Sequence, residues 1–181
     1  MEKATYILKA VVQKAQKGDV QAMASLYNQF SKAMYNICYR MCGTVPDAED
    51  VLQESFLIAF KNLHQLKDEQ LFGGWLKRIV INHCIQHSKK LFYWDHWEHD
   101  EIADAPAEDR WTNIDFEKLN ECIKQLPEGC RQIFTLYAVE DFSHKEIADQ
   151  LGVTEGTSKS QYARARKLLQ EKLLTQIAIN G

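Results

Sequence analysis

Residues 142–174 constrain the fold more than any other part of the chain, because they read FSHKEIADQLGVTEGTSKSQYARARKLLQEKLL. Ser143 followed three residues later by Glu146 forms a capping box, which marks the start of a helix. Gly152 can adopt the positive φ that ends this helix, and Thr154 can cap a second one. The pattern therefore predicts a short helix, a tight turn and a longer helix.

The second predicted helix of this pair is basic. It carries four cations with almost no acid among them: Lys159, Arg164, Arg166 and Lys167. This layout is typical of a helix-turn-helix, whose second helix enters the major groove of DNA. Basic groups there can contact phosphates and base edges. An ordinary pair of surface helices would explain the capping box and the glycine but not the one-sided charge, so the combination favours DNA binding.

Helical periodicity also runs through the N-terminal half, where we find no strand pattern and no internal repeat. The expected helices are one over about residues 4–17, a second capped by Asp19, a third capped by Asp47 and a fourth over about 70–90. A polar loop, residues 64–69, separates the last two. In the fourth helix the spacing predicts a buried stripe of Leu71, Trp75 and Ile79, together with Cys84 or Ile85.

The pattern breaks in residues 91–113, LFYWDHWEHDEIADAPAEDRWTN, which mix aromatic residues with acids. We interpret this stretch as a flexible acidic linker. Two further helices are expected after it, at about 115–125 and 128–139. The sequence therefore predicts an all-α fold with two small helical domains, residues 1–90 and 114–181, the second of which contains the helix-turn-helix.

The net charge of −3 hides an uneven distribution. Residues 1–90 hold twelve Lys and Arg against eight Asp and Glu, whereas residues 91–112 hold one Arg against seven acids. Because one acidic segment accounts for the negative total, the net charge does not exclude a nucleic-acid partner. No apolar run approaches the ~20 residues that span a bilayer, and the N-terminus lacks signal-peptide features, so we expect a cytoplasmic protein.

The cysteines and histidines leave one alternative open, a metal- or redox-dependent protein. His83 and His87 lie four apart beside Cys84, as in some zinc sites, and Cys38 and Cys42 share a helical face. No Cys-x2-Cys or His-Glu-x-x-His is present, however, and the five cysteines have the irregular spacing of buried thiols rather than of a disulfide framework. We also find no phosphate loop, serine elbow or nucleophilic set, so we expect neither an enzyme nor a cofactor.

Four segments of the chain, taken together, match one family in order and spacing. They are KGDVQAMASLYNQF, DAEDVLQESFLIAFKNL, FGGWLKRIVINHCIQHSKK and LPEGCRQIFTLYAVEDFSHKEIADQLGVTEGTSKSQYARARKLL. With them the chain resembles the extracytoplasmic-function group of bacterial RNA polymerase sigma factors, within the sigma-70 family. The resemblance implies a protein that binds core RNA polymerase, directs it to promoters and assists DNA melting. Residues 1–90 would be sigma region 2 and residues 114–181 sigma region 4.

The resemblance implies a polymerase-binding surface in the segment DAEDVLQESF. By match, Asp50, Gln53, Glu54 and Phe56 would lie on or beside that surface. Asp50 and Glu54 lie one helical turn apart, which agrees with an acidic face beside apolar anchors.

The resemblance also implies that residues 63–90 open and read the minus-ten promoter element. An unpaired base needs a pocket, aromatic groups for stacking and cations for the backbone. The loop from His64 to Gln70 would form the pocket, with the amide of Asn82 at its wall. The candidate minus-ten residues are Lys61, His64, Trp75, Lys77, Arg78 and Asn82, with Lys89 and Lys90 as further phosphate contacts.

The recognition helix would read the minus-thirty-five element. By match, its candidate residues are Thr157, Lys159, Ser160, Gln161, Arg164 and Arg166. This chain departs from the family at two positions, because the family often has an apolar residue at Ser158 and a basic one at Gln161. Glutamine favours adenine where arginine favours guanine, so the departure at Gln161 bears on the promoter preference.

Two further expectations come from the family. The acidic linker would thread near the polymerase active site and the RNA exit path, where its carboxylates would occupy a basic channel. An anti-sigma factor is the expected regulatory partner. The alternative is a DNA-binding regulator that never touches polymerase, but it would leave the N-terminal helices and the linker unexplained.

Overall fold

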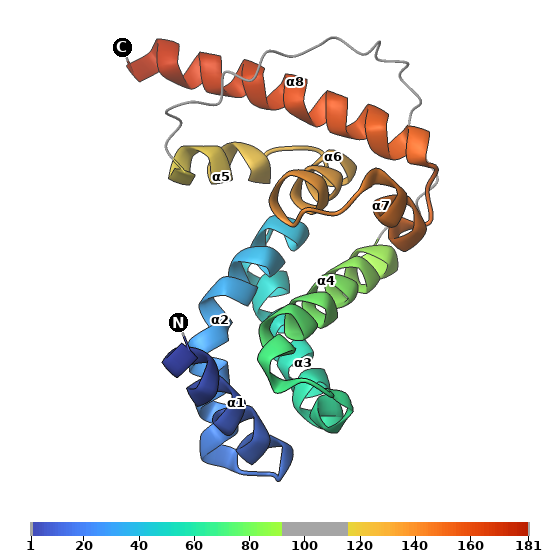
Figure 1. Ribbon diagram of the computed structural model, residues 1–181. Helices are drawn as coiled ribbons and strands as arrows, with labels where there is room; N and C mark the ends of the chain where they lie inside the picture. The colour runs from blue at the N-terminus through green and yellow to red at the C-terminus, as the bar shows by residue number, and fades with distance from the viewer. Residues whose placement is uncertain (1, 92–115, 181) are drawn as a thin grey trace. The chain divides into compact units, whose positions relative to one another are not determined.

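The structure is a computed structural model that describes the backbone of residues 2–91 and 116–180 and the side chains of residues 6–88 and 118–174. Within these ranges every regular element is helical, which confirms the predicted fold class (Figure 1). The chain divides into two compact units, Met1–Phe92 and Tyr93–Gly181. Apart from Leu91, which ends a helix, the expected linker lies outside the described residues.

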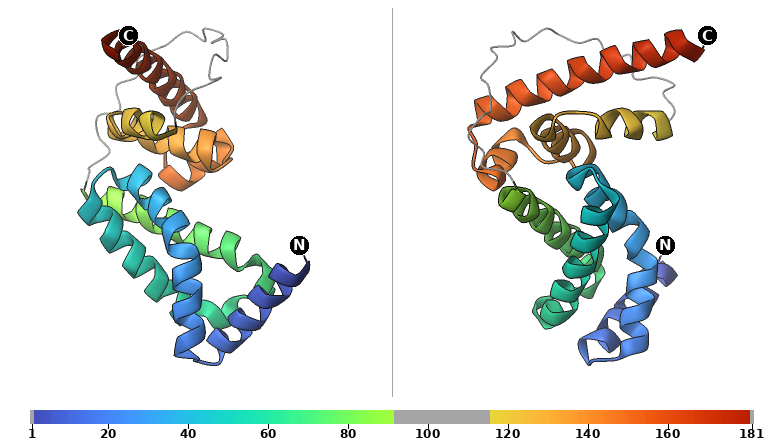
Figure 2. Two further views of the ribbon diagram at one scale, coloured as in Figure 1. Left: turned by 90° about the vertical axis from the view of Figure 1, so that its left-hand side faces the viewer. Right: turned by 180° about the vertical axis from the view of Figure 1, so that it is seen from behind.

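Unit 1 is a helical bundle. Its elements are α1 (Glu2–Gln16), α2 (Val20–Cys42), α3 (Val45–Asn62), the short turns η1 (Leu63–Gln65) and η2 (Glu69–Leu71), and α4 (Phe72–Leu91). Helices α2, α3 and α4 pack on one another, while α1 packs on α2 and on the two short turns (Figure 2). As predicted, Asp19 caps α2, since its carboxylate accepts hydrogen bonds from the backbone N–H groups of Gln21 and Ala22.

Helix α3 begins earlier than the sequence suggested, and Asp47 does not cap it. Thr44 is the N-cap, and its hydroxyl accepts a hydrogen bond from the backbone N–H of Asp47 at 3.3 Å. Pro46 is tolerated because the first turn of a helix needs no N–H donor there. Asp47 then stands inside the first turn, where the helix dipole favours a carboxylate.

The buried stripe of α4 is also shifted from the predicted one. Leu71 is 62% exposed and Trp75 and Ile79 are half-buried, whereas the core residues are Phe72, Leu76, Val80, Ile81, Cys84 and Ile85. Phe72 packs edge-on against Phe30 of α2, with ring centroids 5.1 Å apart. The neighbouring Gly73 lets α2 approach closely, because a Cβ there would lie 3.0 Å from the Phe30 ring.

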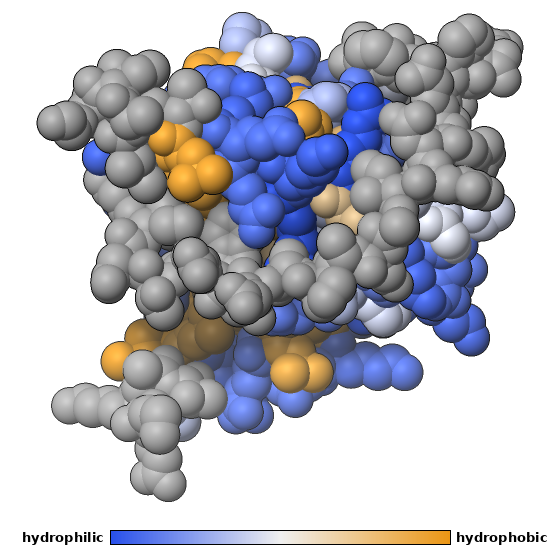
Figure 3. Space-filling view, turned by 90° about the horizontal axis from the view of Figure 1, so that it is seen from above, coloured by the Kyte–Doolittle hydropathy of each residue, from blue (hydrophilic) through white to orange (hydrophobic). Residues whose placement is uncertain are grey.

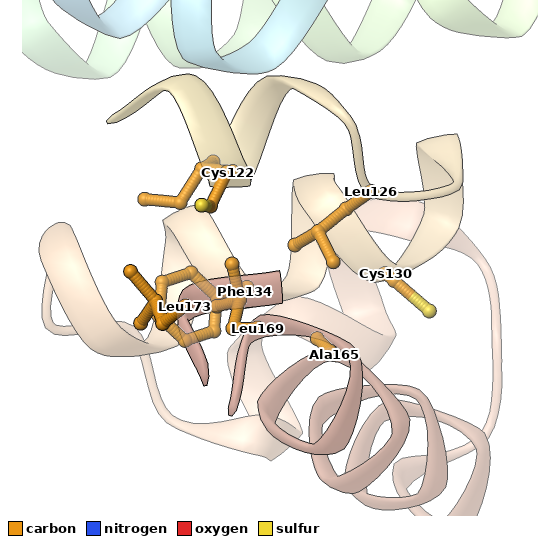
Figure 4. Close-up of a cluster of buried hydrophobic side chains, with 8 residues drawn as sticks. Cys122, Leu126, Cys130, Phe134, Ala165, Leu169 and Leu173 are labelled. Carbon is orange, nitrogen blue, oxygen red and sulfur yellow. The ribbon is translucent and has the colours of Figure 1, made fainter. Parts of the chain in front are cut away.

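Unit 2 contains the predicted helix-turn-helix. Its elements are α5 (Phe116–Lys124), α6 (Glu128–Phe134), a wide turn η3 (Thr135–Val139), α7 (His144–Leu151) and α8 (Glu155–Asn180). Apolar side chains from α5, α6 and α8 form one core. Figure 4 shows its members Cys122, Leu126, Cys130, Phe134, Ala165, Leu169 and Leu173. This core fixes α8 from one side and leaves its opposite face to solvent.

All five cysteines are free thiols, and only Cys42 is more than slightly exposed. None of the described helices combines the length and the apolar character that a membrane-spanning segment needs.

Candidate nucleic-acid interface

The helix-turn-helix has the capping chemistry that the sequence predicted. The Ser143 backbone N–H donates to the Glu146 carboxylate at 2.8 Å, and the Ser143 hydroxyl accepts from the Glu146 backbone N–H, which completes the capping box. Gly152 ends α7 with φ 73°. The Thr154 hydroxyl accepts from the backbone N–H of Thr157 at 3.0 Å and so caps α8. These local bonds set the direction in which α8 leaves the turn.

A polar and aromatic bridge joins the start of α7 to α8. His144 Nδ1 lies 2.9 Å from the hydroxyl of Ser158, which is fully buried. The His144 ring also stacks on Tyr137, with centroids 4.1 Å apart, and meets Tyr162 edge-on. The hydroxyl of Ser158, where the family often has an apolar residue, is therefore hydrogen-bonded rather than left without a partner.

The solvent face of α8 is polar. Lys159 and Lys167 are exposed on it and Ser160 is half-exposed. Seen from above, the described surface of this region is largely hydrophilic (Figure 3). Lys159 pairs with Glu155 one turn earlier at 2.8 Å, but both side chains are largely exposed. Such a surface pair contributes little stability, so Lys159 is available to a phosphate.

Two of the sequence-based candidates, Thr157 and Gln161, do not lie on this exposed face. Gln161 is 7% exposed, and its side-chain oxygen accepts a hydrogen bond from the Cys130 thiol of α6 at 3.0 Å. Thr157 is also buried, with its hydroxyl 2.8 Å from that of Thr154. Both side chains are held by the fold, so neither is presented to a base edge.

The two candidate arginines of α8 are half-buried at the edges of the exposed face. The Arg166 guanidinium lies 5.9 Å from the centre of the Tyr162 ring. Arg164 lies near Cys130, where burial raises the pKa of the thiol to about 11 and the guanidinium opposes that rise. Their long side chains can extend from these edges toward a phosphate backbone.

In unit 1, the outer face of α3 carries the candidate polymerase-binding residues. Asp50, Gln53 and Glu54 are exposed, as expected. Phe56 is 2% exposed and packs against Tyr27 and Phe60, so it belongs to the core and not to the surface.

Sequence reasoning missed the apolar part of the α3 face. Leu57 is 70% exposed and Ile58 is 39% exposed. Leu57 stands four residues after Gln53 and three after Glu54, so it shares their face. The signal was present in the sequence, because the helical spacing of the apolar residues Leu52, Phe56, Ala59, Phe60 and Leu63 predicts an inward stripe that leaves Leu57 outside it.

The two histidines suggested for a metal site pair instead with carboxylates of α3. His83 Nε2 lies 3.0 Å from Glu54 Oε2, while its Nδ1 lies 3.2 Å from the buried Ser55 hydroxyl. His87 Nε2 lies 3.7 Å from Asp47 Oδ1. Among the described residues, no group of three or more His, Cys, Asp or Glu side chains has the geometry to hold a metal ion. The histidines therefore join α3 to α4.

The candidate minus-ten residues on α4 form a stripe. Arg78 and Asn82 are exposed and lie four residues apart, with half-buried Trp75 one turn before them. Trp75 touches the Phe72 ring, with centroids 6.1 Å apart, so it is partly a packing residue. Lys77 is half-buried and points in another direction, because neighbouring helical residues lie on different faces. The side chains of Lys89 and Lys90 lie outside the described residues.

The loop between α3 and α4 precedes this stripe. We call residues 63–71, which comprise η1, η2 and their connection, the reading loop. Lys61 and His64 are exposed at its start. Leu71, at its end, is an exposed apolar side chain that the sequence analysis had placed in the core. Together the loop and the stripe present cations, an amide and apolar groups to solvent, which is the chemistry that a single strand requires.

Comparison with known proteins assigns both units. The model of Sigma-70 region 2 matches residues 26–91, and the model of Sigma-70 region 4 matches residues 116–169. The ECF RNA polymerase sigma factor SigW of Bacillus subtilis is 28% identical over 182 residues, covering 92% of this chain and 97% of the relative. The ECF RNA polymerase sigma-E factor of Haemophilus influenzae is 26% identical over 179 residues, covering 91% of this chain and 94% of the relative.

Solved structures show the same fold. CnrH, in its complex with the cytosolic domain of CnrY, is 19% identical with a TM-score of 0.51, and the match covers 93% of this chain and 97% of CnrH. RpoE from Bartonella quintana, in complex with the anti-sigma factor NepR, is 22% identical with a TM-score of 0.51, and covers 85% of this chain and 98% of RpoE.

The order of the two matched regions rules out a regulator that consists of a helix-turn-helix alone. Sigma factors catalyse nothing themselves; they give RNA polymerase its promoter-specific initiation. With region 2 in unit 1, region 4 in unit 2 and relatives that match along nearly the whole length, this chain belongs to the sigma-70 family of RNA polymerase sigma factors, in its extracytoplasmic-function branch.

Proposed function

We propose that this sigma factor contacts one promoter through two separate surfaces while the α3 face docks on core polymerase. The observation that supports this division is that polar, DNA-suited surfaces occur on both α4 and α8, in the order of region 2 and region 4. Residues 1–90 would recognise and melt the minus-ten element, and residues 114–181 would read the minus-thirty-five element. The protein would act in the cytoplasm, where it meets polymerase.

The polymerase-binding surface consists of Asp50, Gln53 and Glu54, to which we add Leu57. Exposed carboxylates surround an exposed leucine on this face. The carboxylates can attract a positively charged surface of the polymerase, and the leucine can be buried when the two proteins bind. His83 supports the arrangement, because its contact with Glu54 restrains the carboxylate. Phe56 contributes from beneath, as the core residue on which this part of α3 rests.

The minus-ten surface consists of the reading loop and the α4 stripe. Arg78 and Lys61 would contact the phosphate backbone of the DNA, and the Asn82 amide would hydrogen-bond to an unpaired base. His64 and Leu71 offer flat or apolar surface beside it. Melting would follow from capture of the separated strand, since a base held outside the stack cannot re-pair.

The minus-thirty-five surface is the solvent face of α8. We propose Lys159, Ser160 and Arg164 as the groups nearest to base edges, while Arg166 would contact the phosphate backbone of the DNA. Gln161 and Thr157 would act indirectly, by holding the helix in place. The departure from the family at Gln161 would then alter packing rather than base preference.

An anti-sigma factor is the proposed regulatory partner. The solved relative RpoE is described in complex with an anti-sigma factor. In this chain the proposed target of such a partner is the α3 face, because a partner that covers Leu57 and its neighbouring acids would exclude polymerase from them. We propose in addition that the acidic linker occupies a basic channel of the polymerase; its residues lie outside the described part of the chain.

Run-off transcription with core polymerase tests this proposal. We expect Asn82→Ala and Arg164→Ala each to reduce initiation while binding to core polymerase persists. Asn82→Ala should act on the minus-ten element alone, so it should keep its defect on promoters that lack a minus-thirty-five element, whereas Arg164→Ala should lose its defect there. Unchanged transcription with both variants would contradict the assignment of the two surfaces.

A further inference from the structure

Helix α1 has no part in the surfaces described so far, and the region 2 match begins only at residue 26. Two of its glutamines nevertheless contact the reading loop. The side-chain amide of Gln16 donates to the carbonyl oxygens of Leu63 and Leu66, both at 3.1 Å. The amide of Gln13 donates to Glu69 Oε1 at 2.9 Å. One helix thus holds the loop near both of its ends.

The Gln16 contact is specific because it uses both N–H donors of one amide group. Leu63 O also accepts from the Leu66 backbone N–H at 3.2 Å, which closes η1. Carbonyl groups at the end of such a short turn are not all satisfied within it, so they depend on side chains or on water. Gln16 supplies a donor to Leu66 O and a second donor to Leu63 O.

The side chains of the reading loop differ in burial between its two sides. Leu63 and Leu66 are buried, as are Val12 and Ala15 of α1. The side chains between and after them point outward, since His64, Gln65, Lys67, Asp68 and Gln70 are all exposed. The loop therefore rests on α1 through its apolar side chains and its carbonyl groups, and presents its polar side chains to solvent.

We propose that Gln16 is a positioning residue for minus-ten recognition, which fixes the backbone of the reading loop so that a flipped base meets the loop and Asn82 together. A base pocket needs side chains held to within a fraction of an ångström, and a loop achieves this only with support from a rigid element. Helix α1 is that element. This inference rests on the proposed function of the reading loop.

Gln13 has a lesser role, because its partner is exposed. Its hydrogen bond is the main cause that lowers the pKa of Glu69. An exposed pair of this kind is easily replaced by water. Gln13→Leu is therefore a matched control for Gln16→Leu: both remove an amide of the same helix, but only Gln16→Leu removes the side-chain donor from the loop carbonyl groups of Leu63 and Leu66.

The test uses full-length protein assembled with core polymerase and a fluorescent single-stranded minus-ten oligonucleotide. We expect Gln16→Leu to weaken oligonucleotide binding by about tenfold and to reduce discrimination against single-base changes in the element. Gln13→Leu should differ little from the wild type. Hydrogen exchange should accelerate in residues 63–71 but not in α2. Gln16→Lys, whose ammonium group can donate to the same carbonyl groups, should recover part of the binding.

The outcomes separate this inference from the proposed function. Loss of binding in Asn82→Ala with none in Gln16→Leu would overturn the role of Gln16 alone. No loss in either variant would contradict the proposed minus-ten surface itself. If Gln16→Leu fails to fold, the test uses Gln16→Lys instead. The inference would be overturned by a variant in which residues 63–71 exchange rapidly but base discrimination equals that of the wild type.

Discussion

The Cys130 thiol donates a hydrogen bond to the side-chain oxygen of Gln161 across 3.0 Å, and this contact joins α6 to α8, the second helix of the helix-turn-helix. The two residues are 31 positions apart, and both are buried. The amide group of Gln161 is therefore oriented by the protein before any DNA arrives. Gln161, a candidate for base contact in the sequence, thus takes part in the packing between two helices.

The first prediction concerns Gln161→Ala. We expect the free energy of unfolding of unit 2 to fall by about 1–3 kcal/mol, because the substitution removes a buried hydrogen bond and leaves space around Cys130. Promoter preference at the minus-thirty-five element should not change. Denaturant unfolding and transcription from a library of minus-thirty-five sequences would measure both. Ser160→Ala, a neighbouring change on the solvent face, should show the reverse pattern, and a Gln161→Ala protein with relaxed base preference and full stability would refute the packing role.

The second prediction is that the stability of unit 2 depends on pH. Burial, together with the charge of Lys159, lowers the pKa of His144 below its usual value of 6.5, while Glu155 opposes the shift. Lys145 follows His144 in the chain, and the positive end of α7 also disfavours a charged ring. A histidine with a lowered folded pKa stabilises the fold fully above pH 6.5, and this contribution is lost as the pH falls through the folded pKa.

An NMR titration of the His144 ring in the full chain checks this directly. The midpoint should lie below 6.5, and amide exchange in α7 and α8, corrected for its intrinsic pH dependence, should become faster as the pH falls from 6.5 through that midpoint. His144→Phe retains an aromatic ring beside Tyr137 and Tyr162, and it should abolish this dependence on pH. A midpoint above 6.5 would show that the protonated ring is the favoured form in the folded protein.

The features that the sequence predicted correctly are the local ones. The capping box of Ser143, the left-handed Gly152 and the cap at Thr154 each involve groups within three or four residues of one another, so their chemistry is visible in a short segment. The fold class followed from periodicity for the same reason. The exposure of Asp50 and Glu54 on one face of α3 agrees with their helical spacing, while their role at a polymerase interface stays a prediction.

The features that the sequence did not predict depend on distant partners. The register of α4 is set by Phe30 of α2, which receives Phe72 and lies against Gly73, and nothing within α4 specifies that contact. The burial of Gln161 depends in the same way on Cys130. The reach of Gln16 to carbonyl groups 47 and 50 residues away leaves no pattern in the sequence at all.

The third prediction compares two adjacent glycines of α4. A Cβ at Gly73 would lie 3.0 Å from the Phe30 ring, whereas a Cβ at Gly74 would meet nothing within 4 Å. Gly74→Ala should stabilise unit 1 by up to about 1 kcal/mol through helix propensity. Gly73→Ala should lose that gain and destabilise by about 1–3 kcal/mol, because Phe30 and Phe72 must move. Thermal unfolding of the two variants measures the difference. Equal stabilisation by both would show that α2 can move at this contact at little cost in free energy.

The fourth prediction concerns the apolar centre of the α3 face. Leu57 is 70% exposed beside Gln53 and Glu54, and a leucine in that position costs nothing to desolvate and gains free energy when a partner covers it. Leu57→Asp should weaken binding to core polymerase by at least about tenfold, or about 1.4 kcal/mol, with no loss of folding stability since the side chain packs on little else.

Val20→Asp is the matched control, because Val20 is 72% exposed at the start of α2, where a carboxylate suits the helix dipole. Titration of labelled sigma factor with core polymerase measures both constants. Equal weakening by the two variants would mean that added negative charge, and not the loss of Leu57, impairs binding, and the α3 face would then lose its proposed apolar anchor.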